Sequence, residues 1–292
     1  MDLRLKDLMP NRLFKAETKS RIPRGELWIS GTILEELGLE LTQESIVTFS
    51  KEIDADLCFL SYTNTIQQLS VESRDMELNI QKAHDLGLVC GVTVDGPFER
   101  TVNEHGFIET MKLFFNQELL AEQLEQYTAV AAAELDAAEK AGADLLILCD
   151  DIAYNKGLYF SPSKFISNLL PLYQKLRNVV KETTMGFHSD GNVEPILDSM
   201  MDQGYSVFSL EPEAMDLITW SCTLPQNATL LSGIKAEWLM GTEAALRKNK
   251  KEILDYIASL NNGCGLVLAS LCGLNNVQTL NNLKLLYRLL DS

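Results

Sequence analysis

The stretch MGFHSDGN (residues 185–192) holds one of only three histidines in a chain of 292 residues. His188 ends a short apolar run, and Asp190 follows it just before a glycine. An imidazole beside a carboxylate has three common uses: it binds a metal, acts as a general base, or forms a neutral structural hydrogen bond. The stretch alone leaves all three uses open.

The rest of the chain places this stretch in a repeating pattern. Short runs rich in Val, Ile, Leu or Phe alternate with longer helical patterns, which is typical of strands buried on both faces. Eight such strands with intervening helices predict an α/β fold, a (β/α)₈ TIM barrel that spans residues 1–292 as a single domain. We expect strands at residues 26–30, 57–62, 88–94, 144–149, 185–188, 206–210, 229–234 and 265–270, and helices at 117–142, 162–181 and 192–204.

If the chain forms a barrel, the residues that follow its strands are candidates for the active site. In such barrels the active site lies at the C-terminal ends of the strands, so His188 lies at the mouth. The same reasoning brings the residues that follow the other strands to the mouth: Ser61, Tyr62, Asp95, Asp150, Asp151, Asp190, Glu211, Lys235 and Cys272. Adjacent carboxylates at a strand end point in different directions, so we expect one of Asp150 and Asp151 to orient a ligand while the other caps a turn.

Composition narrows the class of protein. The net charge of −16 and the lack of a basic stripe argue against nucleic acid, and they disfavour a ligand with many carboxylates. No apolar run approaches the roughly 20 residues that a membrane span needs, and the N-terminus has no signal-peptide core. The six cysteines are scattered, as in proteins that keep their thiols reduced. We therefore expect a cytoplasmic protein with no membrane partner.

Several spaced motifs resemble one known family. Residues 141–176 (AGADLLILCDDIAYNKGLYFSPSKFISNLLPLYQKL) and 186–213 (GFHSDGNVEPILDSMMDQGYSVFSLEPE) are similar to the uroporphyrinogen decarboxylase superfamily, as are 91–115 (GVTVDGPFERTVNEHGFIETMKLFF) and 265–286 (GLVLASLCGLNNVQTLNNLKLL). This superfamily has a TIM-barrel fold. It includes zinc-dependent methyltransferases that act on methylated corrinoids, such as methylcobamide:coenzyme M methyltransferase.

Two positions resemble the methyltransferase branch more than the decarboxylases. Decarboxylases carry an arginine-rich N-terminal motif, whereas this chain reads SRIPRGELWISG, with Arg21 and Arg24 as the only candidates for remnants. Decarboxylases also have histidine in the turn after the last strand, where this chain has Cys272. Methyltransferases use a cysteine there as a zinc ligand.

The resemblance also implies a set of site residues. Methyltransferases carry His-x-Cys after the fifth strand, and here the sequence is His188-Ser189-Asp190; Glu211 falls where they have an exchangeable zinc ligand. The implied metal ligands are therefore His188, Asp190, Glu211 and Cys272, with His188, Asp190 and Cys272 as catalytic residues. The implied substrate-binding residues are Asp95, Asp150, Asp151 and Tyr154.

The resemblance implies a zinc-dependent methyltransferase that moves a methyl group between a corrinoid, carried by a partner protein, and a thiol or other small acceptor. A catalytic zinc keeps one position open, where a bound thiol becomes the nucleophilic thiolate. Asp190 departs from the family cysteine, which puts the identity of the acceptor in doubt. Two alternatives stay open: a decarboxylase of the uroporphyrinogen type, and a non-catalytic barrel that only binds a ligand.

Overall fold

The computed structural model describes residues 21–62, 73–225, 227–261, 265–271 and 273–292. Within these ranges, seven parallel strands form one sheet in the order β1-β2-β3-β6-β7-β8-β9. Each strand matches one of the predicted apolar runs closely. Their bounds are β1 Leu57–Ser61, β2 Val89–Asp95, β3 Leu145–Cys149, β6 Thr184–Ser189, β7 Val207–Leu210, β8 Thr229–Ile234 and β9 Gly265–Ser270.

The first predicted strand, residues 26–30, takes the eighth place in the barrel wall as a segment with isolated bridges. Arg24 and Ile29 form parallel bridges with Leu268 and Leu274 on the β9 side. On the other side, the backbone N–H of Leu57 in β1 donates to the carbonyl of Arg24, at 3.0 Å. The wall is thus closed between β9 and β1, and the prediction of a (β/α)₈ barrel is confirmed.

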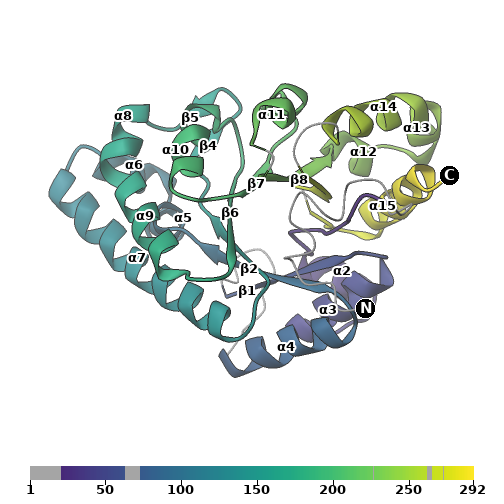
Figure 1. Ribbon diagram of the computed structural model, residues 1–292, viewed down its shortest axis with the longest axis horizontal. Coiled ribbons are helices and arrows are strands. Elements are labelled where there is room, and N and C mark those ends of the chain that lie inside the picture. Colours follow the sequence, from purple (N-terminus) through teal and green to yellow (C-terminus); the bar gives the residue numbers. More distant parts are fainter. Residues whose placement is uncertain (1–20, 63–72, 226, 262–264, 272) are drawn as a thin grey trace.

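Helices surround the strands (Figure 1). The three predicted helical segments correspond to α7, to α8 with a π-helical turn and α9, and to a 3₁₀ turn with α10. No helix in the described part of the chain is long and apolar enough to cross a membrane. The bounds are α2 Gly31–Glu36, α3 Gln43–Glu52, α4 Ser73–Asp85, α5 Pro97–His105, α6 Phe107–Leu113, α7 Gln117–Lys140, α8 Pro162–Lys164, η1 Phe165–Leu169, α9 Leu170–Val179, η2 Glu194–Ile196, α10 Leu197–Asp202, α11 Leu217–Thr223, α12 Ala236–Met240, α13 Glu243–Lys248, α14 Lys250–Leu260 and α15 Val277–Leu290.

The strands are apolar on both faces because each face packs against a different core. One cluster of buried residues lies between the strands and the helices, and a smaller one fills the interior of the barrel. In β3, Leu146 and Leu148 belong to the outer cluster, whereas Leu145, Ile147 and Cys149 belong to the inner one. This alternation explains why the strands read as continuous hydrophobic runs.

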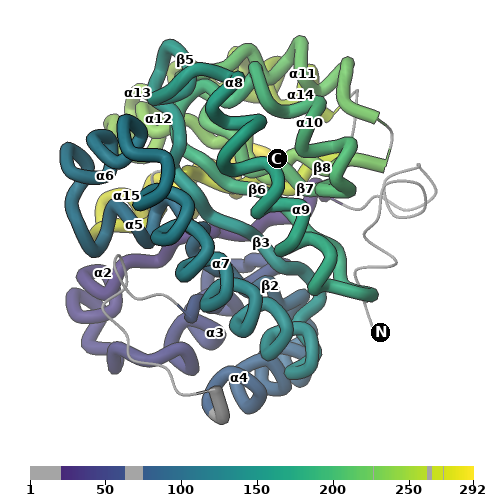
Figure 2. The backbone as a smooth tube through the Cα atoms, turned by 90° about the vertical axis from the view of Figure 1, so that its left-hand side faces the viewer, coloured from purple at the N-terminus to yellow at the C-terminus, as the bar shows by residue number. Residues whose placement is uncertain are grey.

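The same alternation aims His188 into the barrel. His188 is paired in register with Cys149 of β3 and with Ser209 of β7, while Phe187 before it packs in the outer core. Two residues earlier on the inner face, Gly186 leaves room for its neighbours, because a Cβ there would lie 2.5 Å from the Ile147 side chain. Figure 2 views these strands from the side of α7 and α9.

Candidate functional site

His188 is a buried side chain whose two ring nitrogens have different surroundings. It is 3% exposed. Its Nδ1 lies 2.9 Å from the hydroxyl of Ser209, its register partner on β7. The edge of the Trp28 ring packs against the imidazole, with 5.8 Å between the ring centroids. These contacts fix the orientation of the ring and leave Nε2 facing the mouth.

Two carboxylates face Nε2 from the ends of neighbouring strands. Asp151 Oδ1 and Asp190 Oδ1 each lie 3.9 Å from His188 Nε2. The Asp190 backbone N–H donates to Asp151 Oδ1 at 2.8 Å, which holds the two loops together. Their side chains are 39% and 58% exposed, respectively. A buried imidazole therefore meets two carboxylates that ligands can reach.

These three residues fit a metal ion. One donor atom from each of Asp151, His188 and Asp190 lies within 4.8 Å of the others. Two donors that each bind zinc at about 2.0–2.2 Å are at most about 4.4 Å apart, so the 3.9 Å spacings fit and the carboxylates need only a small movement. The Ser209 contact at Nδ1 is the kind of outer hydrogen bond that orients a metal-binding histidine.

The observed cluster overlaps the predicted ligand set in part. His188 and Asp190, two of the predicted ligands, lie together with Asp151, for which we predicted substrate binding. The roles of all three stay predictions. Glu211 lies next to the group but accepts a hydrogen bond from the Gly191 backbone N–H at 2.7 Å. Cys272 lies outside the described residues, so its place as a ligand stays a prediction.

The turn at Gly191 brings Glu211 and the β4–β5 hairpin (Ala153–Tyr154 and Gly157–Leu158) close to the histidine. Gly191 has φ +81°, a conformation that favours glycine, and a Cβ there would lie 2.5 Å from the backbone nitrogen of Tyr154. The glycine thus lets the loop after β6 pack directly on the hairpin.

Asp150 has a different environment from Asp151. It is fully buried and accepts hydrogen bonds from the backbone N–H groups of Phe98 and Glu99 in the first turn of α5, and from the hydroxyl of Tyr173. Burial raises its pKa to about 7. Gly96 makes room for it, because a Cβ there would lie 2.3 Å from the Asp150 carboxyl. Asp150 therefore ties α5 to β3, and of the pair Asp151 is the one that faces the mouth.

The mouth is strongly acidic. Burial and the negative charges of Asp151, Asp150 and Asp95 raise the pKa of Glu99 to about 8. Burial raises the pKa of Asp190 to about 6, an effect that His188 opposes and that Asp151 and Glu211 reinforce. These carboxyl groups come from four different strand ends. They crowd one another at one edge of the barrel.

Aromatic rings form one wall of the mouth. The exposed ring of Tyr154 stacks on Tyr159 with centroids 5.9 Å apart, and Phe107 of α6 meets Tyr159 edge-on at 4.7 Å. Burial raises the pKa of Tyr159, and the charges of Asp151 and Asp190 add to the effect. Tyr159 therefore lies near enough to these carboxylates to feel their charge. The predicted contact of Tyr154 with substrate stays a prediction, but the residue lies in the right region.

The remaining strand-end residues line the wall or neighbouring loops. Asp95 is buried at the end of β2, where its carbonyl accepts from Arg100 at 2.9 Å. The Ser61 carbonyl accepts from the Gln43 side chain, and Tyr62 beside it is half-buried. Their contacts with substrate stay predictions.

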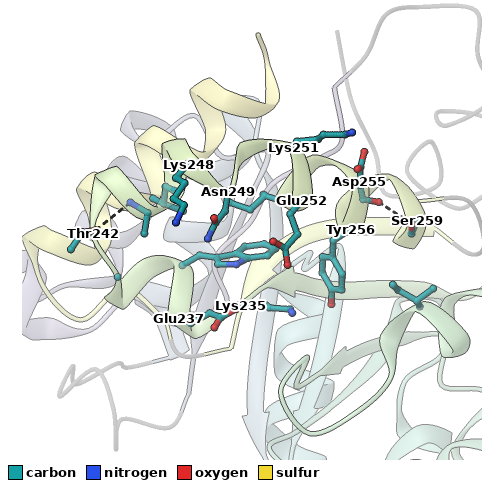
Figure 3. A pocket seen from close by; sticks show the side chains of 16 residues that line it. Lys235, Glu237, Thr242, Lys248, Asn249, Lys251, Glu252, Asp255, Tyr256 and Ser259 are labelled. Carbon is teal, nitrogen blue, oxygen red and sulfur yellow. Dashed lines mark hydrogen bonds between the residues drawn. The ribbon is translucent and has the colours of Figure 1, made fainter.

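Lys235, at the end of β8, lies beside a separate cavity. Its ammonium lies over the rings of Tyr256 and Trp238, at 4.8 and 5.8 Å, as Figure 3 shows for Lys235 and Tyr256. The cavity of about 800 Å³ lies among α12, α13 and α14, and His188, Asp151 and Asp190 do not line it. This cavity is thus distinct from the histidine site.

Sequence reasoning did not place Asp151 and Ser209 next to His188. Cys149 of β3 pairs with His188 of β6. Asp151 lies two residues after Cys149 and Asp190 lies two residues after His188, so the two aspartates are neighbours. Ser209 faces His188 for the same reason. The sequence spacing carries this information only together with the register. Residues at equal distances after two paired residues on adjacent strands are expected to be neighbours.

Comparison with known proteins supports the predicted family. The family model described as uroporphyrinogen decarboxylase (URO-D) matches residues 88–292, which is more than half of the chain. A search of curated proteins found no match.

Solved structures support the fold. A methyltransferase from Methanosarcina mazei is similar over 99% of this chain and 98% of its own, with a TM-score of 0.72 and 18% sequence identity. A sugar phosphate isomerase/epimerase from Parabacteroides distasonis is similar over 92% of this chain and 97% of its own, with a TM-score of 0.54 and 13% identity. At these identities the likeness shows a shared fold.

Proposed function

The chain belongs to the uroporphyrinogen decarboxylase family, and from that premise we propose that it is a zinc-dependent methyltransferase. It would move a methyl group between a corrinoid carried by a partner protein and a thiol or other small acceptor. One observation carries the proposal: a buried histidine turns its free nitrogen toward two accessible carboxylates at the mouth of the barrel. This donor set suits zinc or another divalent metal.

Each residue would have a distinct task. His188, Asp151 and Asp190 would hold the metal, and Ser209 would keep the imidazole in its orientation. A zinc ion held there would supply Lewis-acid chemistry, which would favour loss of the proton from a thiol acceptor. The net transfer would form a bond between sulfur and the methyl carbon, break the cobalt–carbon bond with its electron pair left on cobalt, and release the thiol proton to solvent.

The structure gives little support to porphyrinogen decarboxylation. Both arginines that could stand for the decarboxylase motif lie at the N-terminal end of the barrel. Arg21 pairs with Asp56 at 2.7 Å, and Arg24 pairs with Asp54 at 3.1 Å, just before β1 begins. A substrate with many carboxylates would instead meet the carboxylates of the mouth, which disfavour its binding.

An exposed apolar surface beside the mouth supports delivery of the methyl group by a protein. Ile108 of α6 is 69% exposed and Phe115 just after it is 89% exposed. With Phe107 and Met111 they line a hollow of about 550 Å³ that also contacts Tyr159 of the mouth. We call these four residues the α6 patch. An exposed apolar patch of this kind, next to a reactive site, is typical of a docking surface.

Metal content and methyl transfer test the proposal together. The purified protein should contain close to one zinc per chain by elemental analysis, and it should transfer the methyl group of methylcobalamin to a thiol, followed by absorbance. His188→Gln should lose both. His105→Gln is a matched control, because His105 is exposed and contacts only Gln123 at 3.0 Å among the hydrogen bonds of its ring.

The outcomes separate the candidate functions. A protein that holds no divalent metal and transfers no methyl group to any thiol or pterin acceptor would favour the binding barrel. Release of carbon dioxide from uroporphyrinogen, unaffected by a chelator, would favour the decarboxylase.

A further inference from the structure

We propose that the mouth selects its acceptor by charge and takes a neutral or positively charged thiol rather than an anionic one, with Glu213 as a specificity-determining residue. This inference rests on the proposed function. It concerns the second substrate of the same site, which neither the family nor the metal ligands identify.

The first argument is the charge that remains after a metal is bound. A divalent cation would balance the carboxylates of Asp151 and Asp190. Glu211 and Glu213 would still keep their charges on the rim: Glu211 is fixed on the Gly191 N–H of the loop after β6, and Glu213 on the Ala236 N–H after β8, each at 2.7 Å. Both therefore have a defined place on the rim, and neither depends on the metal for it.

The second argument is how the nearby cations are used. Arg100 pairs with Glu134 and donates to the Asp95 carbonyl. Lys235 lies over the rings of Tyr256 and Trp238, as Figure 3 shows for Tyr256. Within the described residues, Asp151 and Asp190 form no ion pair with a lysine or arginine. A sulfonate or carboxylate on an acceptor would therefore meet the like charge of the rim carboxylates, and the ammonium of Lys235 already attracts Glu213.

The third argument is independent of the acidic residues. The aromatic wall of Tyr154, Tyr159 and Phe107 borders the same space, and Trp28 contacts the histidine. A ring face attracts a cation rather than an anion, and Tyr154, which packs beside the loop after β6, is 47% exposed. Carboxylates and an exposed ring together suit an ammonium group on the acceptor, or a neutral one.

The charge effect should be large enough to measure. Unit charges roughly 8 Å apart, at an effective dielectric constant between about 20 and 80, change an affinity by about two- to thirtyfold. Several carboxylates act in the same direction, so we expect at least about tenfold tighter binding of a cationic thiol than of an anionic one of equal length.

Three thiols with the same two-carbon backbone test this inference. Mercaptoethylamine trimethylated at nitrogen (the amine below), whose quaternary nitrogen cannot bind cobalt, is a cation, mercaptoethanol is neutral and mercaptoethanesulfonate is an anion. Each is titrated into the protein loaded with Co²⁺ in place of zinc, and binding is read from the thiolate-to-cobalt absorption band. The amine should bind tightest and the sulfonate weakest, with a gap that narrows at high salt.

A pair of glutamate variants assigns the effect to Glu213. In Glu213→Gln the amide oxygen can still accept from the Ala236 N–H, so the loop should keep its fold while one charge is lost. The preference for the amine over the sulfonate should fall by about two- to tenfold. Glu182→Gln is the matched control, because Glu182 is exposed just before β6 begins, at the opposite end of the barrel, and the preference should not change.

The results distinguish this inference from the proposed function. If Co²⁺ does not bind, or no thiol produces the band, the proposed function itself is wrong. If the thiols bind but the sulfonate binds as tightly as the amine, charge selection is wrong and the methyltransferase proposal stands. If the preference is present but Glu213→Gln leaves it unchanged, Glu213 is not the specificity-determining residue.

Discussion

The two ends of the barrel hold their acidic side chains in opposite ways. At the N-terminal end, Asp56 pairs with Arg21 and Asp54 with Arg24. At the mouth, Asp151 and Asp190 face each other and one histidine, at 3.9 Å from its ring. Charges paired within the protein can contribute to stability, whereas crowded like charges cost stability unless a ligand balances them. The difference supports the proposal that one end serves the fold and the other binds a cation.

The largest expected effect on stability lies at the N-terminal end. Arg24 is buried, stacks on Tyr287 at 4.2 Å, and pairs with Asp54 and Asp291. Breaking a buried pair costs about 3–5 kcal/mol, and the partial exposure of both partners reduces this to about 2–4 kcal/mol for Arg24→Met. Urea unfolding measures the loss. The zinc affinity of the folded fraction should stay at the wild-type value; a parallel loss of zinc would contradict the separation of the two ends.

Ser209→Ala should give the opposite pattern. Loss of the hydroxyl at His188 Nδ1 removes the contact that orients the ring. Outer contacts of this kind are worth about 10–100-fold in metal affinity, whereas one hydrogen bond contributes only about 1 kcal/mol to stability. Competition with a chelator measures the zinc affinity, and urea unfolding measures the stability. Ser232→Ala, which removes a buried hydroxyl bonded to the Leu210 carbonyl on the same sheet, is the control.

A change of pH should also separate the barrel wall from the mouth. Burial raises the pKa of Glu26, in the closing segment, to about 7. A carboxyl whose pKa is raised by folding stabilises the fold at low pH, and this contribution is lost as the pH rises through the folded pKa. Glu26 should therefore lower the free energy of unfolding by on the order of 1–3 kcal/mol between about pH 5 and 8. The raised pKa values of Asp150 and Glu99 at the mouth act in the same direction, so the part of the fall that Glu26→Gln removes measures Glu26.

At the mouth, a rise in pH should increase the affinity for zinc, whereas it lowers the free energy of unfolding. The pKa of Asp190 is raised to about 6, mainly by burial. Protons compete with the metal for a carboxylate, so zinc affinity should fall as the pH drops through about 6. Chelator competition at several pH values measures this. If zinc affinity is constant between pH 5 and 7, Asp190 is not a metal ligand.

The sequence predicted the fold well because the signal is repeated along the chain. Each buried strand carries its own apolar run, and helices separate the runs, so a single misplaced boundary does not change the topology. The first run, residues 26–30, is the weakest case. There the chain forms bridges at Arg24 and Ile29 rather than a continuous ladder, although it still closes the barrel.

The site was predicted less completely because it depends on register. His188 and Asp190 could be located by following one strand to its end. Asp151 could be recognised as their neighbour only with the pairing of Cys149 and His188, which the sequence does not show. Asp150 and Asp151 look equivalent in the sequence, and tertiary contacts separate them: Asp150 binds the start of α5, and Asp151 faces the histidine.

The smallest expected effect concerns the α6 patch, which lies at the same end of the barrel as the acidic mouth but is apolar. If the patch receives the partner protein, Phe115→Ser should weaken transfer from a corrinoid held on a protein and leave transfer from free methylcobalamin unchanged. Truncation of one interface residue typically costs about 1–2 kcal/mol, so the KM for the carrier protein should rise by about five- to thirtyfold while kcat stays similar. Leu78→Ser is the control, because Leu78 is 62% exposed on α4, outside the patch. An equal loss with free methylcobalamin would show that Phe115 acts on the mouth itself, and an unchanged KM for the carrier would rule out the patch as its docking surface.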